Sequence, residues 1–262
     1  MKEQIIKRLS GHSWAKLLQV HEVLDSTNTH AKELARQGAP EGTVVIARSQ
    51  TGGRGRLGRS FHSPRDSGLY LSLILRPNCA ASELMHLTCA VAVAACDAVE
   101  QACGLRPGIK WINDLVVDGK KLGGILTELS FGSNGNVSYA VIGIGINCRP
   151  AVLPEELRGL ACSLSQFTDR NDPALLASEL ILALETMSKQ LLSHQEDIME
   201  RYRQSCVTLG RQVRVISPTG VETGVAERLN NDGSLTVLFD NGQRKNVNSG
   251  EVSVRGLWDY VK

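Results

Sequence analysis

The first two-thirds of the chain alternates between helix-like and strand-like patterns of hydrophobic residues. Between Ser26 and Gly38, apolar residues recur at helical spacing, which predicts a helix that begins just after Ser26. The runs 43–48 and 69–75 are rich in β-branched and apolar residues and predict two strands. The segment between these strands contains many glycines, so we expect a loop there.

Further along, residues 82–103 are rich in Ala, Leu and Val, and their spacing predicts a long buried helix. Later runs rich in Val and Ile predict strands at 109–117, 122–129 and 137–146. Asp118-Gly119 predicts a tight hairpin turn after the first of them. Helical spacing returns twice more, which predicts helices at 173–192 and 198–209. Together these elements indicate an α+β fold, with a mixed or antiparallel sheet and flanking helices.

After Gly210 the pattern changes to short strands separated by turn sequences. Strand-forming residues cluster at 213–216, 224–226, 235–239 and 252–254. Gly, Pro, Asn and Asp fill the turns between them. We therefore expect an α+β domain at 1–209 and a small β-barrel domain at 210–262 that abuts it. The alternative is that 211–262 is only the last subdomain of one unit.

Length and charge narrow the possible functions. A chain of 262 residues can bury a sizeable core without disulfide support. Lys and Arg number 29 against 27 Asp and Glu, which gives a formal net charge of +2. This balance does not imply a general affinity for DNA or for an anionic membrane. Any basic function must therefore be local.

The cysteines of the chain include no C-x-x-C pair. Cys89, Cys96 and Cys103 recur at a regular interval, which places them on one face of the predicted long helix. Small buried thiols in a reducing cytosol explain this pattern better than a metal site or a disulfide framework. The N-terminus lacks the apolar h-region of a signal peptide, and no run of about 18 uncharged apolar residues occurs. We expect a soluble cytoplasmic protein.

Residues 52–59 alternate glycines with three arginines. Glycine lets the backbone approach a ligand closely, and each guanidinium group supplies charge and several hydrogen-bond donors. This composition suits an anionic ligand that is held partly by main-chain N–H groups. The segment, called here the glycine-arginine loop, is a candidate anion-binding site.

A set of short segments is distinctive in its order and spacing. They are Ser26-Thr27-Asn28, residues 50–61, Lys110-Trp111-Ile112-Asn113-Asp114, residues 120–126 and Gly143-Ile144-Gly145-Ile146-Asn147. The set resembles the biotin protein ligases, whose patterns run STN, GRGRxGR, KWPND, KLxGIL and GxGxN. Ile112 stands where that family usually has proline, and Phe61 where some members have tryptophan. The resemblance covers nearly the whole chain and implies a class II synthetase-like catalytic domain followed by an SH3-like barrel.

Members of that family join biotin to ATP, which forms biotinyl-5′-AMP and pyrophosphate, and then transfer the biotinyl group to a lysine of a biotin carboxyl carrier protein. The resemblance implies this activity (EC 6.3.4.15), with biotin, ATP and Mg²⁺. It also implies the monofunctional type without DNA binding, because the segment before Ser26 is too short for a winged helix-turn-helix domain. We expect no membrane partner, and a homodimer through an exposed sheet edge stays open.

By resemblance, one set of residues lines the biotin pocket: Ser26, Thr27, Asn28, Gln50, Arg54, Gly55, Arg56 and Lys121. Hydroxyl and amide groups suit the polar ureido ring of an otherwise apolar ligand. A carboxylate that attacks a polyphosphate brings like charges together, so fixed cations must offset the repulsion. Lys121 and Arg56 are the expected catalytic residues, with Lys121 between the biotin carboxylate and the α-phosphate.

The resemblance assigns a second set to the nucleotide: Arg59, Phe61, Lys110, Asn113, Asp114, Asn147 and Arg255. In this assignment Phe61 offers a stacking face to adenine, and Arg255 reaches back from the C-terminal domain. Hard oxygen ligands suit Mg²⁺, and Asp114 is the candidate metal ligand.

Simpler explanations compete with each assignment. Ser26-Thr27-Asn28 could be only a helix cap, Lys120-Lys121 a solvated hairpin corner, and Gly143-x-Gly145 a place of close packing. A lipoate protein ligase would share the fold and the adenylation chemistry. A nucleic-acid-binding module would use the arginines of the glycine-arginine loop on phosphates. The C-terminal barrel could also recruit a partner protein instead of serving an active site.

Overall fold

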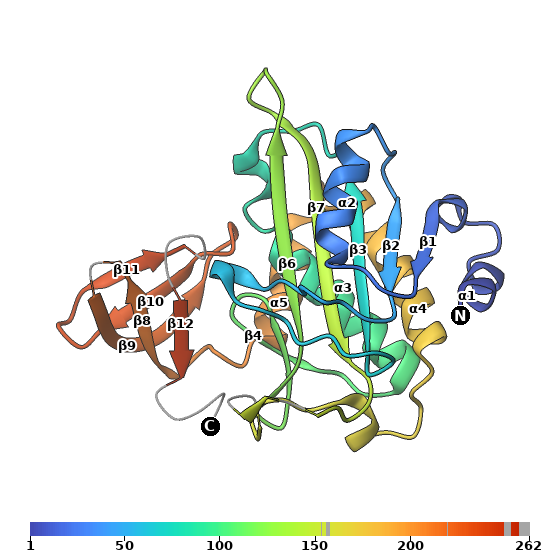
Figure 1. Ribbon diagram of the computed structural model, residues 1–262. Helices are drawn as coiled ribbons and strands as arrows, with labels where there is room; N and C mark the ends of the chain where they lie inside the picture. The colour runs from blue at the N-terminus through green and yellow to red at the C-terminus, as the bar shows by residue number, and fades with distance from the viewer. Residues whose placement is uncertain (153, 156–157, 219, 249–252, 257–262) are drawn as a thin grey trace.

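In the computed structural model, the main sheet has seven strands in the order β1-β2-β3-β7-β6-β5-β4 (Figure 1). They are β1 (Leu18–His21), β2 (Val44–Ala47), β3 (Gly68–Leu75), β4 (Gly108–Lys110), β5 (Asp114–Val117), β6 (Lys120–Phe131) and β7 (Val137–Asn147). β1 pairs with β2 in parallel, and the other neighbours pair antiparallel. The structure describes residues 1–152, 154–155, 158–218, 220–248 and the backbone of 253–256.

Helices cover both faces of this sheet (Figure 1). They are α1 (Lys2–Arg8), α2 (Thr27–Arg36), α3 (Leu87–Cys103), α4 (Pro173–Gln190) and α5 (Gln195–Ser205). Short 3-10 turns lie at η1 (Ser13–Leu17), η2 (Arg56–Gly58), η3 (Ala81–Leu84) and η5 (Leu164–Gln166). α2 contacts one face at β2, β3 and β7, whereas α3 and α4 pack on the other face and α5 packs on α3. The predicted mixed sheet with flanking helices is confirmed.

Alternation of side chains along the strands decides which helix covers which face. On β3, Leu71 and Leu73 belong to the large core beneath α3 and α4, while Ile74 belongs to a small core beneath α2. α2 contributes Ala31 and Ala35 to that small core, and its N-cap is Ser26 as predicted. Because α2 is only ten residues long, it covers only part of its face.

α3 is the central helix of the large core. The segment Ala81–Cys103 is apolar and long enough to cross a membrane by composition, but 72% of its most apolar window is buried inside the protein. Cys89, Cys96 and Cys103 of α3 are at most 2% exposed. All seven thiols are free and buried, and burial raises the pKa of each thiol. The interpretation of these cysteines as small core residues is confirmed.

The predicted single strand at 109–117 is wrong. The chain forms β4 and β5, which pair antiparallel and are separated by a turn at residues 111–113. The peptide bond between Trp111 and Ile112 is cis. The two residues are 5% and 3% exposed and lie in the large core. The apolar residues of this segment therefore include a buried turn, which local hydrophobicity cannot distinguish from a strand.

Two helix boundaries also differ from the prediction, and one strand was not predicted. The helix expected at 198–209 is α5, which ends at Ser205 because the next residues pair with β4 through an N–H of Val207 that donates to the carbonyl of Ile109. The long helix begins at Leu87 and follows the separate turn η3. Strand β11 (Arg244–Val247) was not predicted, because three of its four residues are exposed and polar.

A second sheet follows α5, in the order β11-β10-β9-β8-β12, with all pairs antiparallel. Its other strands are β8 (Gln212–Ser217), β9 (Gly220–Leu229), β10 (Leu235–Phe239) and β12 (Ser253–Gly256). Figure 1 shows this sheet beside β4 and α5. The small C-terminal β-structure is confirmed, and its closure into a barrel stays a prediction.

The C-terminal end of α2 is held by Arg76, which follows β3. Its guanidinium Nη2 donates to the carbonyls of Ala35 at 2.7 Å and Ala39 at 2.9 Å, and its Nε donates to Ala39 at 3.0 Å. A cation at this end also favours the helix dipole. We expect the R76A variant to lose about 1.5–3 kcal/mol of unfolding free energy, as measured by urea denaturation followed by circular dichroism.

The matched control is R36A in the last turn of the same helix. Among the described residues, Arg36 forms an ion pair with Glu33 at the exposed surface. Removing such a pair should change the unfolding free energy by less than about 0.5 kcal/mol. Equal losses in R76A and R36A would contradict the assignment of Arg76 as the clamp of α2.

Candidate active site

The register of the sheet brings two rows of small and polar residues onto the α2 face. One row crosses five strands through Lys110, Asp114, Gly124, Gly145 and Tyr70, which are successive cross-strand partners. The next row, two residues along β7, joins Leu126, Gly143 and Ser72. Directly paired residues share a face of the sheet, and the two rows are roughly 7 Å apart. These rows form the floor of the candidate active site.

Two glycines of β7 let other segments lie on this floor. A Cβ atom at Gly143 would stand 2.1 Å from Oδ1 of Asn28, and one at Gly145 would stand 2.5 Å from the ring of Phe61. α2 therefore rests on position 143, and the segment after the glycine-arginine loop rests on position 145. The simpler explanation of Gly143-x-Gly145 as a place of close packing is confirmed.

The N-terminus of α2 carries a buried hydrogen-bond network. The backbone N–H and the hydroxyl of Thr27 both donate to Oε1 of Gln50, at 2.8 and 3.1 Å. Nε2 of Gln50 donates to Ser63 at 2.8 Å. The hydroxyl of Ser72 lies 2.6 Å from Oδ1 of Asn28 and 2.8 Å from Oγ1 of Thr27. The segment is thus both a helix start, capped by Ser26, and a set of oriented amides and hydroxyls.

The amide of Asn28 is oriented by a carboxylate that the sequence did not single out. Nδ2 of Asn28 donates to Oε2 of Glu128 at 2.9 Å, and Lys32 donates to Oε1 of Glu128 at 2.8 Å. Burial opposes the charge of Glu128, but the hydrogen bonds from Lys32 and Asn28 outweigh it and hold its pKa below the ordinary value. Arg54 lies 3.9 Å from the same carboxylate. Ser72 and Glu128 were missed because one polar residue in a strand has no meaning until its register is known.

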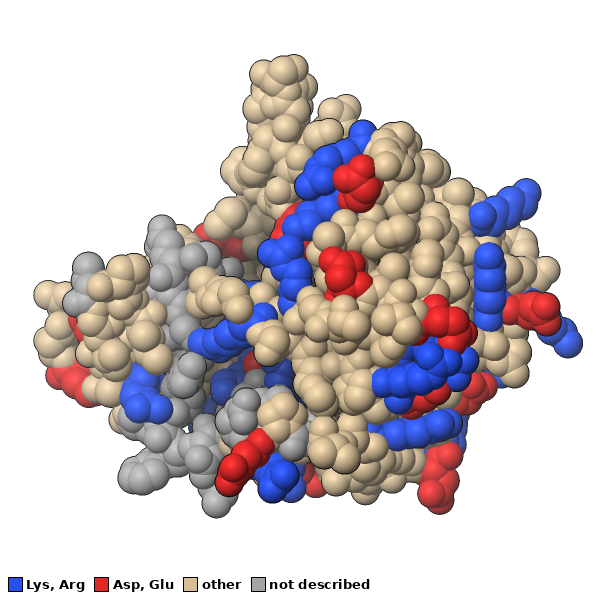
Figure 2. Space-filling view, viewed as in Figure 1, with Lys and Arg blue, Asp and Glu red and all other residues tan. Residues whose placement is uncertain are grey.

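The glycine-arginine loop crosses the floor as a folded segment. Its N–H at Gly55 donates to the carbonyl of Arg59 at 2.7 Å, and Arg54 pairs with Ser60 in an isolated antiparallel bridge. A Cβ atom at Gly53 would stand 2.3 Å from the carbonyl of Phe61, so this position needs glycine. Figure 2 shows Lys and Arg side chains in a band along α2 toward this loop. This band brings several basic side chains together although the net charge of the chain is only +2.

At the other end of the first row, two cations meet a carboxylate and an amide. Nη1 of Arg56 donates to Oδ1 of Asn113 at 3.0 Å, and Nζ of Lys121 donates to Oδ1 of Asp114 at 2.6 Å. Burial lowers the pKa of Arg56, while the charge of Asp114 opposes this shift. The Lys121 side chain is 28% exposed, whereas Lys120 is fully at the surface. Lys121 is therefore not a solvated hairpin corner, although the Asp118-Gly119 turn beside it is confirmed by positive φ at both residues.

The other residues that the sequence predicted for the site lie in different places. Phe61 lies over β7, with its ring 6.3 Å from that of Tyr70. Asn147 ends β7, and its amide donates to the carbonyl of Cys162 at 3.0 Å, while the N–H of Cys162 donates to the carbonyl of Lys121 at 2.9 Å. Arg59 is exposed. Arg255 belongs to β12, where its backbone pairs with Arg214, but its side chain lies outside the described residues.

Asp114, the predicted metal ligand, is the carboxylate in contact with Lys121. Within the described ranges, no three or more His, Cys, Asp or Glu side chains come together as a metal site. Mg²⁺ that shares its coordination with substrate phosphates needs only one or two protein carboxylates. Asp114, with the amide oxygen of Asn113 beside it, fits that requirement.

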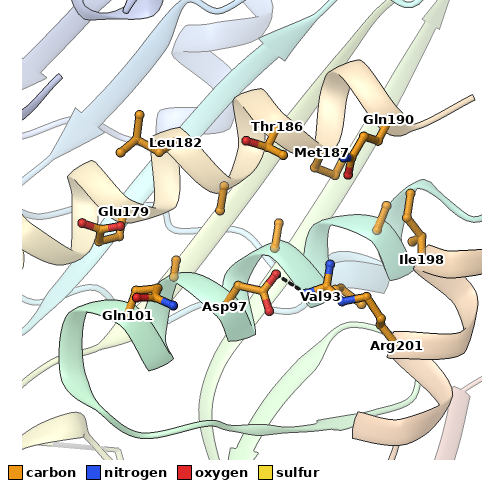
Figure 3. Close-up of a pocket in the computed structure, with 14 residues that line it drawn as sticks. Val93, Asp97, Gln101, Glu179, Leu182, Thr186, Met187, Gln190, Ile198 and Arg201 are labelled. Carbon is orange, nitrogen blue, oxygen red and sulfur yellow. Dashed lines mark hydrogen bonds and ion pairs between the residues drawn. The ribbon is translucent and has the colours of Figure 1, made fainter. Parts of the chain in front are cut away.

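A pocket lies between α3, α4 and α5, on the side of the sheet opposite to α2 (Figure 3). Its floor is made of Ala and Val side chains such as Val93 and Ala94, and its rim includes Asp97, Glu179 and Arg201. None of the residues that line it belongs to the two rows or to the glycine-arginine loop. This pocket is thus separate from the candidate active site on the α2 face.

Comparison with known proteins gives a consistent result. Residues 20–147 match the model of the biotin/lipoate A/B protein ligase family, and residues 208–255 match the biotin protein ligase C terminal domain. The chain is 37% identical to the bifunctional ligase/repressor BirA of Bacillus subtilis over 229 residues, which cover 86% of this chain and 70% of that protein. It is 32% identical to the biotin–[acetyl-CoA-carboxylase] ligase of Mycobacterium tuberculosis, over 96% of this chain and 93% of that one.

Among solved structures, the biotin protein ligase from Aquifex aeolicus in complex with biotin and ATP superposes with a TM-score of 0.78 at 28% identity. The match covers 91% of this chain and 98% of that one. It therefore spans both sheets described above.

The charge of Glu128 makes a pH-dependent contribution to stability. Its pKa is lower in the folded protein than its ordinary value of 4.5, so its charged form stabilises the fold at neutral pH. This stabilisation is lost as the pH falls through the folded-state pKa. We expect E128Q to be less stable than the native protein at pH 7, and the difference in unfolding free energy to shrink below about pH 4.5.

Urea denaturation between pH 3 and pH 7 measures this difference. E33Q, on the exposed side of α2, is the control and should change the unfolding free energy little at any pH. A difference between native protein and E128Q that grows as the pH falls would have the wrong sign for this account.

Proposed function

The chain belongs to the biotin protein ligase family, and we propose that it is an ATP-dependent ligase that attaches biotin to a lysine of a biotin carboxyl carrier protein through biotinyl-5′-AMP. The observation that carries the proposal is that two groups of polar side chains lie over the same face of the sheet. Asn28 of the α2 network lies over Gly143 in the second row, and Asp114 in the first row holds Lys121, so the two groups of side chains lie over neighbouring rows of one sheet face. A ligand with a polar ring at one end and a carboxylate at the other can reach both.

We assign the biotin end to the α2 network. The ureido ring needs both donors and acceptors, because a buried polar group without a partner is costly. Thr27, Asn28 and Gln50 supply hydroxyl and amide groups whose directions are fixed by Ser72, Ser63 and Glu128. Ser26 caps the helix that presents them. Arg54 and Gly55 would cover the tail of biotin from the glycine-arginine loop.

We assign the chemistry to Lys121 and Arg56. A carboxylate oxygen of biotin attacks the α-phosphorus of ATP, the bond from that phosphorus to the bridging oxygen breaks, and pyrophosphate leaves with the electron pair. Both reactants are anions, so cations fixed before the reaction lower its barrier without reorganisation. Lys121 and Arg56 are held by Asp114 and Asn113 from the row next to the biotin network. In the second step the lysine amine of the carrier attacks the acyl carbon, loses a proton and releases AMP.

The nucleotide end is proposed for the outer part of the first row. Phe61 would offer its ring to adenine, while Lys110, Arg59 and Asn147 would lie near the phosphates and ribose. Asp114 and Asn113 would hold Mg²⁺, which supplies charge neutralisation at the phosphates. For Arg255 we keep the proposal that it approaches the nucleotide from β12.

The acceptor and the setting follow from the same proposal. The acceptor is a carrier protein with an exposed lysine, and the compartment is the cytoplasm, in keeping with seven free buried thiols. We propose that residues 1–209 form the ligase domain and residues 210–262 a C-terminal domain. No DNA contact is assigned to either.

The adjacent lysines Lys120 and Lys121 give a matched test of the chemical assignment. K121A should reduce formation of biotinyl-5′-AMP by about 10²–10³-fold, because it removes a cation that acts on the developing charge. K120A removes an exposed charge one residue away and should keep nearly full activity. The measurement is the initial rate of biotin- and ATP-dependent labelling of a carrier-domain lysine, with adenylate quantified in parallel.

Near-normal adenylate formation by a folded K121A would remove the central assignment. Replacing biotin by lipoate in the same assay tests the substrate, and equal rates with the two acids would contradict the proposed specificity.

A further inference from the structure

The turn between β4 and β5 carries Asn113 and Asp114 into the site, and it is held from two sides. Within the main sheet, the N–H of Ile125 on β6 donates to the carbonyl of Asn113 at 2.9 Å, and Nδ2 of Asn113 donates to the carbonyl of Ile125 at 3.0 Å. Trp111 and Ile112, at the start of the turn, are held from outside the main sheet. β4 and β5 form the edge of that sheet, so the turn has sheet neighbours on one side only. A buried backbone group without a hydrogen bond costs free energy, so the partners of this turn decide where it lies.

Three hydrogen bonds hold Trp111 and Ile112, and their partners are residues beyond 200. The backbone N–H of Trp111 donates to Oγ1 of Thr208 at 2.9 Å. The indole Nε1–H of Trp111 donates to the carbonyl of Gly233 at 3.0 Å. The hydroxyl of Tyr202 donates to the carbonyl of Ile112 at 3.1 Å. Tyr202 is fully buried, and Thr208 is 7% exposed.

These three partners belong to different segments. Tyr202 lies on α5, Thr208 lies between α5 and β8, and Gly233 lies in the turn between β9 and β10. The turn that contains Gly233 itself packs against α3. Gly233 has φ +85°, and a Cβ atom there would stand 3.2 Å from Sγ of Cys89 on α3. The carbonyl of Gly233 is therefore presented to Trp111 by a turn that has little room to move.

On the opposite side the same turn meets the two cations. Asn113 accepts from Arg56 and Asp114 accepts from Lys121, through the contacts described above. The turn is thus placed between the proposed reaction site and the C-terminal segments. The biotin network has separate supports, because Gln50, Ser72 and Glu128 belong to other elements.

Resting on the proposed function, we infer that Tyr202, Thr208 and the carbonyl of Gly233 are positioning groups for the nucleotide half of the site. They hold the Trp111–Ile112 backbone so that the following residues, Asn113 and Asp114, face Arg56 and Lys121. Of the three anchors, Gly233 lies in the proposed C-terminal domain, so that domain takes part in positioning the site without contact with substrate. Loss of one anchor should weaken ATP use and leave biotin use nearly unchanged.

Thr208 allows a test with two nearly isosteric variants. T208V keeps the shape of the side chain and removes the acceptor for the Trp111 N–H, whereas T208S keeps the hydroxyl. We expect T208V to raise KM for ATP at least about fivefold, which corresponds to the loss of one buried hydrogen bond. T208S should restore KM for ATP to within about twofold of the native value, and KM for biotin should change little in either variant.

Y202F removes the second anchor with minimal change in volume, and it should also raise KM for ATP about fivefold. S178A is the stability control, because Ser178 is 1% exposed and donates to Ala174 within α4, at a distance from the turn in the chain and in the fold. It should leave both KM values near native. A purely structural role of Thr208 would instead lower the amount of active enzyme in T208V, with KM for ATP unchanged.

Calorimetric titration of a non-hydrolysable ATP analogue separates this inference from the proposed function. If native protein binds the analogue and forms adenylate, but T208V and Y202F bind the analogue as tightly as native protein, the positioning role is overturned and the function stands. If native protein forms no adenylate with biotin and ATP, the proposed function fails. Failure of native protein to bind the analogue overturns the positioning role as well.

Discussion

The rest of the site depends on two glycines of β7, Gly143 and Gly145, which leave space over the sheet. At Gly143 and Gly145 the sheet has no Cβ atoms, and Asn28 and Phe61 occupy the space. α2 can approach the sheet this closely because position 143 has no side chain, and the segment after the glycine-arginine loop can do so because the ring of Phe61 occupies the space over position 145. Any side chain at either glycine would push a ligand-facing segment off the floor. The arrangement of the biotin network and of the loop follows from that close approach.

The charges of the site are organised by the same register. Lys110, Asp114 and Gly124 are consecutive partners in one row, so the carboxylate stands beside the strand that carries Lys121. Arg56 reaches this row from the glycine-arginine loop through Asn113. Partly buried cations interact strongly with a ligand anion because water screens them less. The neutral balance of the whole chain, +2, is compatible with this because the basic groups that matter are few and local.

Much of this could be predicted from sequence, for identifiable reasons. The helix after Ser26, the strands around the glycine-arginine loop and the hairpin at Asp118-Gly119 are local patterns with local causes, and they were found. The turn inside 109–117 was not predicted from the sequence. Its apolar residues Trp111 and Ile112 are buried by tertiary contacts with α5 and with the turn between β9 and β10, which a local pattern does not show. Glu128 and Ser72 face Asn28 only because of the register of their strands, and they lie 100 and 44 positions from Asn28 in the sequence. The roles given to individual residues in biotin and nucleotide binding remain proposals that rest on this geometry.

The most direct measurement is isotope exchange between pyrophosphate and ATP in the absence of carrier protein. The account places one acyl carboxylate and one α-phosphate together on a common floor, so exchange should require biotin and should vanish when biotin is left out. Exchange that proceeds without biotin, or no exchange when biotin, ATP and Mg²⁺ are all present, would contradict the claim that this face of the sheet joins the two.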